Sequence, residues 1–155
     1  MIRPAQPGDR AAVEAIVRAA YSVYIERIGK PPGPMLDDYT RLIDEGAVSV
    51  TDADDAIAAL IVLVPKPDHL LLDNIAVHPD RQGQGLGRRL IAFAENEARR
   101  LGYAELRLYT HATMTENIAL YTRLGFAETR RGRETGYDRV FMTKRLGSPD
   151  ANSPP

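Results

Sequence analysis

A glycine-rich stretch in the middle of the chain constrains the fold more than any other segment. Residues 74–90 read Asn-Ile-Ala-Val-His-Pro-Asp-Arg-Gln-Gly-Gln-Gly-Leu-Gly-Arg-Arg-Leu. This pattern predicts a buried strand, a tight turn and the first turns of an amphipathic helix. The glycines allow positive φ and close approach of the backbone to another group, and the helix start presents free amides and the positive end of its dipole. With arginines on both sides, the stretch predicts a cradle for a pyrophosphate.

The spacing of these glycines excludes two common phosphate-binding loops. A dinucleotide-binding loop needs Gly-x-Gly-x-x-Gly, whereas the glycines here are Gly83, Gly85 and Gly87. A nucleoside-triphosphate loop needs Gly-Lys followed by Ser or Thr, which this stretch lacks. The strand–loop–helix unit also lies in mid-chain after two antiparallel strands, and no acidic ribose partner ends the next strand. The anion is therefore expected to belong to another class of ligand.

The composition is that of one globular domain large enough for a proper core. The 155 residues are 44% hydrophobic and 26% charged, with a net charge of −1, so nothing in the overall charge favours a nucleic-acid or membrane partner. The absence of cysteine excludes disulfides and thiolate chemistry within the chain, and we expect no metal. No apolar run approaches the ~20 residues of a membrane span, and no signal-peptide pattern opens the sequence. A cytoplasmic location is expected.

Hydrophobic periodicity predicts a mixed α/β fold. Expected strands cover residues 1–4, 47–51, 57–64, 70–77, 105–110, 126–131 and 137–146. Expected helices run from about 9 to 29, from 36 to 45, from the glycines to 102, and from 115 to 124, with a proline-rich loop at 30–34. The helix between strands 70–77 and 105–110 predicts that they are parallel neighbours. Residues 1–146 are expected to form a single domain, and residues 147–155 a disordered tail.

Two segments resemble the GNAT (GCN5-related N-acetyltransferase) superfamily. Residues 82–87, Gln-Gly-Gln-Gly-Leu-Gly, match its Gln/Arg-x-x-Gly-x-Gly/Ala motif, and Ile-Ala-Val-His-Pro precedes them as in that family. Residues 117–126, Asn-Ile-Ala-Leu-Tyr-Thr-Arg-Leu-Gly-Phe, look like its Asn-x-x-Ala-x-x-Leu/Tyr-Tyr-x-x-x-Gly-Phe segment. The resemblance covers residues 57–146. It implies the acyl-CoA N-acyltransferase fold: a central mixed, mostly antiparallel sheet of six to seven strands, flanked by about four helices.

The resemblance also implies a ligand and a reaction. Acetyl-CoA would be the donor, and a primary amine of a small molecule or protein would attack it directly in a ternary complex. The amides of residues 82–88 would hold the pyrophosphate, the strand at 75–77 would pair with the pantetheine arm and polarise the thioester carbonyl, and Asn117 would bind the pantetheine. The residues implied in donor binding are Ile75, Ala76, Val77, Gln82, Gly83, Gln84, Gly85, Leu86, Gly87, Arg88, Asn117 and Tyr121.

Proton transfer needs further groups. Tyr121 is the candidate acid for the departing sulfur, the alternative being an aromatic that only packs its helix on the sheet. Asp73, a carboxylate in an otherwise apolar strand, is one candidate base, unless it turns to solvent or to an arginine. His111, just after the next strand, is the other, unless it is merely solvated, and a water chain could replace both. His69 and His78 have weaker claims.

Acceptor recognition is expected from the first two helices, their connecting loop and the terminal hairpin. The side chains available there are Tyr21, Tyr24, the loop 31–34, Asp37, Asp38 and the charged run 130–134. Two alternatives stay open: a non-catalytic acyl-CoA-binding or regulatory module on the same fold, and transfer of a longer acyl group. The sequence is also compatible with a homodimer.

Overall fold

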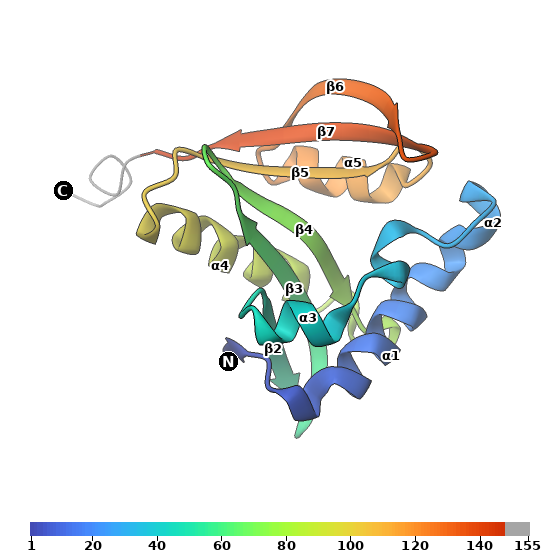
Figure 1. The fold of residues 1–155 in the computed structure, drawn as a ribbon, viewed down its shortest axis with the longest axis vertical. Coiled ribbons are helices and arrows are strands. Elements are labelled where there is room, and N and C mark those ends of the chain that lie inside the picture. The colour runs from blue at the N-terminus through green and yellow to red at the C-terminus, as the bar shows by residue number, and fades with distance from the viewer. Residues whose placement is uncertain (148–155) are drawn as a thin grey trace. The chain divides into compact units, whose positions relative to one another are not determined.

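A computed structural model of the protein describes residues 1–147 and shows a mixed α/β fold (Figure 1). The strands are β1 (Ile2–Pro4), β2 (Val48–Ala53), β3 (Ala56–Pro65), β4 (Leu70–Val77), β5 (Glu105–His111), β6 (Ala127–Glu134) and β7 (Tyr137–Arg145). The α-helices are α1 (Arg10–Tyr21), α2 (Ile25–Ile28), α3 (Tyr39–Asp44), α4 (Leu86–Arg100) and α5 (Thr115–Arg123). Short 3-10 turns are η1 (Pro7–Asp9), η2 (Ser22–Tyr24), η3 (Gly33–Leu36) and η4 (Pro79–Arg81).

Hydrogen bonds join the strands in the order β1-β2-β3-β4-β5-β7-β6. The pairs β1–β2, β2–β3, β5–β7 and β6–β7 are antiparallel, whereas β4 and β5 are parallel. In the parallel pair, Leu70–Leu72 lie opposite Leu106–Leu108. This confirms both the predicted mixed, mostly antiparallel sheet and the parallel neighbours on either side of α4.

The chain divides into two compact units. Unit 1 contains Met1–Leu63 and Asp73–Leu90, and unit 2 contains Val64–Leu72 and the chain from Ile91 onward. The boundaries do not fall in loops, because the chain passes from one unit to the other inside β3, β4 and α4. Each unit is described below by itself.

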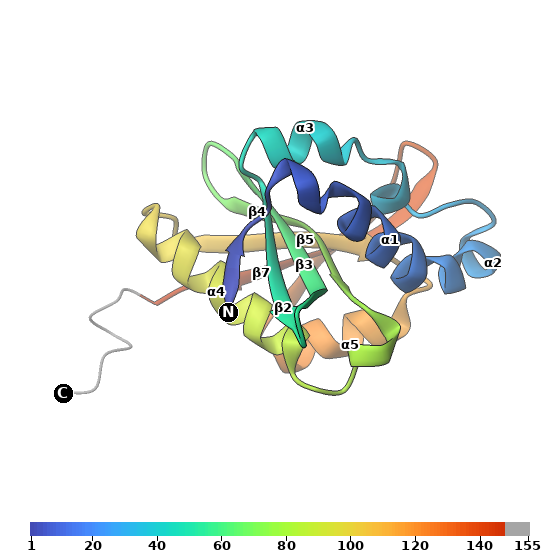
Figure 2. The ribbon, with the colours of Figure 1, turned by 90° about the horizontal axis from the view of Figure 1, so that it is seen from below.

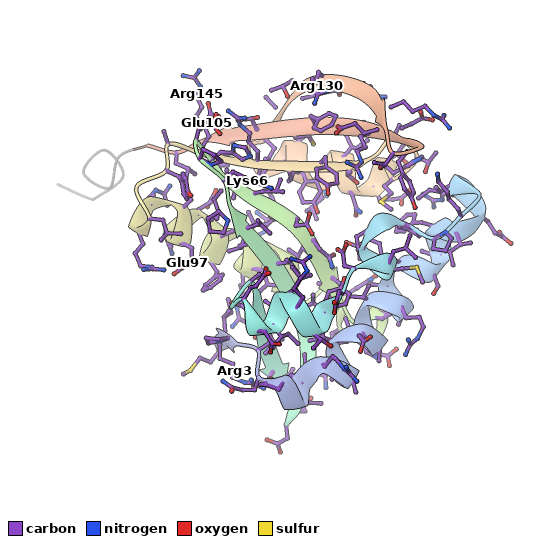
Figure 3. All side chains as sticks on the ribbon, in the orientation of Figure 1. Arg3, Lys66, Glu97, Glu105, Arg130 and Arg145 are labelled. Atoms are coloured by element: carbon purple, nitrogen blue, oxygen red, sulfur yellow. The ribbon has the colours of Figure 1, made fainter. Side chains whose placement is uncertain are left out.

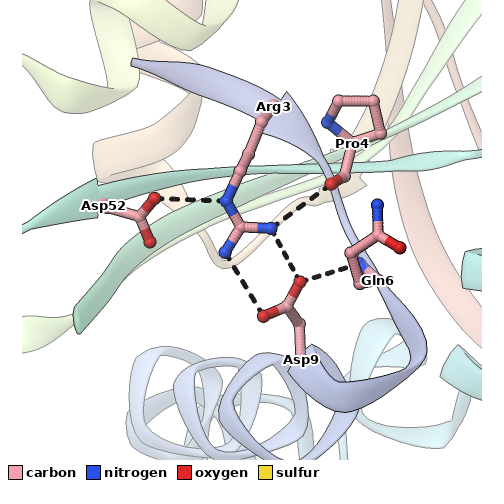
Figure 4. A network of polar contacts seen from close by, with 5 residues as sticks. All are labelled: Arg3, Pro4, Gln6, Asp9 and Asp52. Carbon is pink, nitrogen blue, oxygen red and sulfur yellow. Dashed lines mark hydrogen bonds and ion pairs between the residues drawn. The ribbon is translucent and has the colours of Figure 1, made fainter. Parts of the chain in front are cut away.

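In unit 1, the amphipathic α1 packs beside α3 (Figure 2). The buried stripe of α1 consists of Val13, Ile16, Val17 and Tyr21, as its sequence period predicts. Buried residues of β2 and β3, among them Val48, Val50, Leu60, Ile61 and Val62, provide much of the core of this unit. A network of charged groups fixes the N-terminal strand to the start of α1: Asp9 accepts from the backbone amide of Gln6 at 2.7 Å and pairs with Arg3 at 2.8 Å (Figure 4).

Two predicted helices differ from those observed. The helix expected over 9–29 is interrupted after Tyr21 by η2, where the Ser22 hydroxyl donates to the Arg18 carbonyl, and it ends at Gly29 with φ 87° as expected. The helix expected from Leu36 begins only at Tyr39. Its N-cap is Asp38, whose carboxylate accepts from the Arg41 amide at 3.2 Å, and residues 33–36 form a separate 3-10 turn.

In unit 2, β6 and β7 form the terminal hairpin, and β5 pairs with β7. Helix α5 contacts β6. The hairpin is longer than predicted, because β6 continues to Glu134 and the turn is made by Thr135 and Gly136, both at positive φ. Arg145 of β7 forms an ion pair with Glu105 of β5 at 4.0 Å (Figure 3). Apart from Gly147, the predicted C-terminal tail lies outside the described residues. Over residues 1–147, no helix is long and apolar enough to cross a bilayer.

Candidate functional site

The glycine-rich loop of unit 1 has the backbone that an anion cradle requires. Gly83 and Gly85 have φ of 81° and 79°, in the left-handed region, and a Cβ at either position would meet no other atom within 4 Å. Gly87 lies in the first turn of α4 and needs no positive φ. Within residues 1–147, the backbone amides of residues 82–88 have no hydrogen-bond acceptor. The loop therefore offers free donors and open space at the start of a 15-residue helix.

Charge around the loop fits an anion as well. The first turn of α4 contains no acidic residue, and Arg88 and Arg89 are exposed there. Arg81, by contrast, pairs with Asp54 of the β2–β3 turn at 2.7 Å, so its charge is largely neutralised within the protein. His78 has a structural role: its amide donates to the Ala58 carbonyl at 2.8 Å, and its Nδ1 accepts from the Asp80 amide at 3.0 Å. The cationic part of the cradle is thus the helix start and its arginines.

Strand β4, which leads into the cradle, has a buried polar residue that the sequence analysis did not single out. Asn74 is only 2% exposed. Its Oδ1 accepts from the Tyr21 hydroxyl at 2.6 Å, and its Nδ2 donates to the Tyr39 hydroxyl at 2.8 Å. The Tyr21 hydroxyl also lies 2.8 Å from the Ile75 carbonyl oxygen. An asparagine in a predicted buried strand does signal that a partner is needed, but it does not identify the partner.

Asp73, the candidate base on β4, is half-buried and lies near the carboxyl group of Asp37. Asp37 directly follows η3, and the charge of Asp73 acts on it. Burial, followed by the negative charge of Asp73, raises the pKa of Asp37 to about 6, although Arg41 acts in the opposite direction. Burial and, after it, the same two carboxylates raise the pKa of Tyr39, so that this phenol stays protonated. Asp37 and its neighbour Asp38 thus have different roles, since Asp38 caps α3.

The remaining predicted residues lie in unit 2. Tyr121 on α5 is 6% exposed, and its ring lies 5.8 Å from that of Phe126 at 65°. Asn117 donates from Nδ2 to the Met114 sulfur at 3.7 Å. Gly125, between Tyr121 and Phe126, has φ 98°, and a Cβ there would lie 3.0 Å from the Lys144 side chain. The positive φ favours glycine at that position, which explains the Gly-Phe end of the segment.

His111 is held by a neighbouring threonine. Its Nδ1 accepts from the Thr113 amide at 3.1 Å and lies 2.9 Å from the Thr113 hydroxyl. The ring also makes an edge contact with Tyr137, with centroids 6.3 Å apart. Because Nδ1 is an acceptor, the proton of the neutral ring is on Nε2. His69 is likewise engaged, with its Nδ1 2.7 Å from Asp68.

Comparison with known proteins agrees with these features. The sequence profile of the acetyltransferase (GNAT) family matches residues 12–126. The ribosomal protein bS18-alanine N-acetyltransferase of Salmonella typhimurium is 42% identical over 76 residues, which cover 49% of this chain and 51% of that protein. The chain therefore matches about half the length of this curated relative.

Two of the matching solved structures cover nearly the whole chain. The crystal structure of the ribosomal-protein-S18-alanine N-acetyltransferase from Escherichia coli has a TM-score of 0.76 and 26% identity, covering 99% of this chain and 98% of that one. The PaiA N-acetyltransferase from Thermoplasma acidophilum, solved in complex with coenzyme A, also has a TM-score of 0.76, at 18% identity and 94% and 98% coverage, which bears on the fold alone. By its sequence profile, its fold and the geometry of its glycine-rich loop, this chain belongs to the acetyltransferase (GNAT) family.

Proposed function

We propose that the protein is an acetyl-CoA-dependent N-acetyltransferase. The observation that carries this proposal is the cradle of unit 1: Gly83 and Gly85 at positive φ, free amides at residues 82–88, and a basic first turn of α4. This arrangement suits a pyrophosphate, because helix N-termini and successive backbone amides bind such anions. Family membership specifies which pyrophosphate is to be tested first, namely that of coenzyme A.

The donor, when bound, supplies an acetyl group activated as a thioester. The backbone of residues 82–88 would hold its phosphates, with Arg88 adding charge. Ile75, Ala76 and Val77 would align the pantetheine arm along β4, and one backbone N–H there would polarise the thioester carbonyl. Asn117 would add a hydrogen bond to the same arm. These assignments rest on the family resemblance, and the cradle geometry supports the first of them.

For proton transfer, we propose Tyr121 as the acid and Asp73 as the base. Tyr121 would give its hydroxyl proton to the leaving sulfur, and Asp73 would take the proton that the amine must lose. Asp73 is favoured over His111, because the acceptor nitrogen of His111 already binds the Thr113 amide. The contact of Asp73 with a protonatable neighbour, Asp37, also suits a group that exchanges protons.

The acceptor class is a primary amine of a small molecule or a protein. The relative from Salmonella and the structure from Escherichia coli are both named for acetylation of an alanine of a ribosomal protein, which favours a protein amine. An acceptor of that kind implies a cytoplasmic reaction. A homodimeric state stays a prediction, and transfer of an acyl chain longer than acetyl is distinguished by the turnover experiment below.

The proposal is tested first by binding and then by turnover. Isothermal titration of the protein with acetyl-CoA should give saturable binding, and Gly85→Asp should abolish it, because a carboxylate would lie where the phosphates bind. Gly8→Asp is the matched control, since Gly8 in η1 of the same unit also has open space around it but lies outside the cradle. Normal binding by Gly85→Asp would show that the donor site is elsewhere.

A turnover measurement distinguishes an enzyme from a module that only binds acyl-CoA. Release of free thiol from acetyl-CoA should require an added amine, and we would screen small amines beside a six-residue peptide with an N-terminal alanine. Binding without thiol release by any amine would favour a non-catalytic acyl-CoA-binding or regulatory module. Faster release from a longer acyl-CoA would identify that acyl group as the substrate instead.

A further inference from the structure

The terminal hairpin of unit 2 carries a positive charge that the chain as a whole lacks. The whole chain has a net charge of −1. Over residues 127–145, which contain β6 and β7, six arginine and lysine residues stand against three aspartate and glutamate residues. A surplus of cationic groups on so short a segment attracts anionic partners. The strength of that attraction depends on which of the cations are already paired.

Two arginines of the hairpin keep free donors. The other four cations each pair with a carboxylate: Arg131 with Glu128, Arg133 with Asp138, Lys144 with Glu95 and Arg145 with Glu105. Among residues 1–147, the Arg130 side chain makes no hydrogen bond, and its contact with the Glu134 carboxylate is 3.8 Å long. Over the same residues, the Arg139 side chain has no carboxylate partner, and its one hydrogen bond, to the Thr135 hydroxyl, is 3.5 Å long. The N–H groups of Arg130 and Arg139 are therefore available to a ligand.

Each of these two guanidinium groups lies over an aromatic ring. The Arg130 guanidinium carbon is 3.7 Å from the centre of the Phe141 ring, and that of Arg139 is 4.2 Å from the centre of the Tyr109 ring. The two ring centres are 6.0 Å apart, because Tyr109 and Phe141 are partners in the pairing of β5 with β7. We call these four residues the arginine–aromatic row. Stacking on a ring holds a guanidinium in place while its N–H groups stay free to bind.

The row borders a hollow in unit 2. The hollow has a volume of about 810 Å³, and Arg130, Phe141 and Tyr109 are among the residues that line it. Arg107 and Arg145 line it too, so that three arginines and one acidic residue belong to the lining. The hollow therefore has room for a ligand larger than a single ion, and the charge of its lining favours an anionic one.

The rings of the row favour a polypeptide over a single-stranded nucleic acid. Bases bind such surfaces by stacking on exposed aromatic faces. Here Phe141 and Tyr109 are both half-buried, and an arginine already lies over each ring. What the row offers instead is guanidinium N–H groups, whose paired geometry matches the two oxygens of a carboxylate. The row is therefore better suited to glutamate and aspartate side chains than to bases.

We propose that the arginine–aromatic row is a docking surface for an acidic polypeptide segment of a partner protein. Arg130 and Arg139 each bind a carboxylate of that segment, and the hollow beside them receives the adjoining residues. Phe141 and Tyr109 hold the two guanidinium groups in place before the partner arrives, which lowers the conformational entropy lost on binding. This binding does not depend on the proposed function, because it needs neither acetyl-CoA nor an amine.

The proposal is tested by isothermal titration of the full 155-residue chain with a ten-residue peptide of alternating glutamate and alanine. The peptide carries an acetylated N-terminus, so it cannot act as an amine acceptor. We expect saturable binding in 50 mM salt, and no binding of the same peptide with glutamine in place of glutamate. Arg130→Gln and Arg139→Gln should each weaken the binding about tenfold, since each removes one charge-assisted contact.

The matched control is Arg133→Gln. This variant removes the same charge from β6, but from an arginine that pairs with Asp138 at 3.4 Å, so the peptide should bind with nearly the wild-type affinity. Arg130→Lys keeps the charge and loses the planar fork of N–H groups, so it should weaken binding almost as much as Arg130→Gln. Far-UV circular dichroism of every variant verifies that the fold is intact.

Three results would overturn the proposal. If the wild type does not bind the glutamate peptide, the row is not a docking surface for acidic segments. An equal loss of affinity in Arg133→Gln and in Arg130→Gln would show that net charge alone attracts the peptide. Tighter binding of a single-stranded uridine decamer than of the peptide, lost in Arg130→Gln and Arg139→Gln, would identify the row as a nucleic-acid site instead.

Discussion

Tyr121 packs within unit 2 and is also the proposed acid. Its ring packs against Phe126, and its backbone carbonyl accepts from the Phe126 amide at 3.0 Å. Tyr121→Phe keeps the ring and removes only the hydroxyl. We therefore expect kcat to fall about 100-fold, as for the loss of a general acid, with an unchanged Kd for acetyl-CoA. Steady-state kinetics and calorimetry on the same preparation measure both quantities, and an unchanged kcat would leave Tyr121 with the packing role alone.

Asp37 makes stability depend on pH in a direction opposite to that of most carboxylates. Its pKa is raised to about 6 in the folded protein, so the folded state binds a proton that the unfolded state releases near its ordinary pKa of 3.8. The stability due to this group is present below about pH 4 and is lost as the pH rises through about 6.

Replacement of Asp37 by asparagine should remove this dependence. Asp37→Asn keeps a group that can donate to Asp73, and above pH 7 it should raise the free energy of unfolding by about 1–2 kcal/mol, after allowance for solvent screening. Near pH 4 the gain should vanish. Urea denaturation of both proteins at pH 4.5 and pH 8 checks this, and an equal difference at the two pH values would contradict the assignment.

Residues of the site differ in how far the sequence alone could predict them. Gly83 and Gly85 were predictable, because positive φ is a property of a residue and its immediate neighbours. The partners of Asn74 were not, since Asn74 meets Tyr39 and Tyr21 across 35 and 53 residues of chain. Likewise, Asp37 and Asp38 look equivalent in sequence. Only the fold distinguishes them, because Asp37 lies near Asp73 and Asp38 caps α3.

Gly85 in the glycine-rich loop and Gly87 in the first turn of α4 provide an internal comparison of two glycines. Gly85 has φ 79° and Gly87 is helical, and neither would meet an atom within 4 Å on gaining a Cβ. Gly85→Ala should therefore lower the free energy of unfolding by about 1 kcal/mol through backbone strain. Gly87→Ala should raise it by about 0.5–1 kcal/mol, because alanine is the better helix former. Chemical denaturation without ligand measures both changes. A lower free energy of unfolding in both variants would show that steric crowding, rather than φ, determines the effect of the added Cβ.

Elements defined by strong local patterns were predicted well, and those set by competing signals were not. The strand at 70–77 has the predicted bounds, since an apolar run between turn residues leaves little choice. The helix expected to begin at Leu36 begins at Tyr39 instead, because the side chain of Asp38 caps the helix at that point. The helix over 9–29 fails at Ser22 for a similar reason: its hydroxyl competes for the backbone.

At the scale of the whole molecule, we propose that residues 1–146 act as one domain. The two compact units exchange chain within β3, β4 and α4, so neither unit can lose its structure without disrupting elements that continue into the other. Unfolding should therefore be a single transition. The sequence could not reveal this division, because it contains no linker at any of the crossing points.

A pair of fluorescent variants tests the single transition. The chain has no tryptophan, so Tyr24→Trp reports on unit 1 and Tyr103→Trp on unit 2. Urea titrations of the two variants should give the same midpoint, and it should coincide with the loss of far-UV circular dichroism. Two separate midpoints would show that the units unfold independently.

The lysine beneath the Gly125 turn has a consequence for a protein of this family. Lys144 donates from Nζ to the Leu124 carbonyl at 2.7 Å and forms an ion pair with Glu95. Nζ would have to leave both of these partners before it could attack a carbonyl. Lys144 is thus a poor target for self-modification by the thioesters that the cradle is proposed to bind. Lys66, which is exposed directly after β3, is the more accessible of the two lysines to acylation.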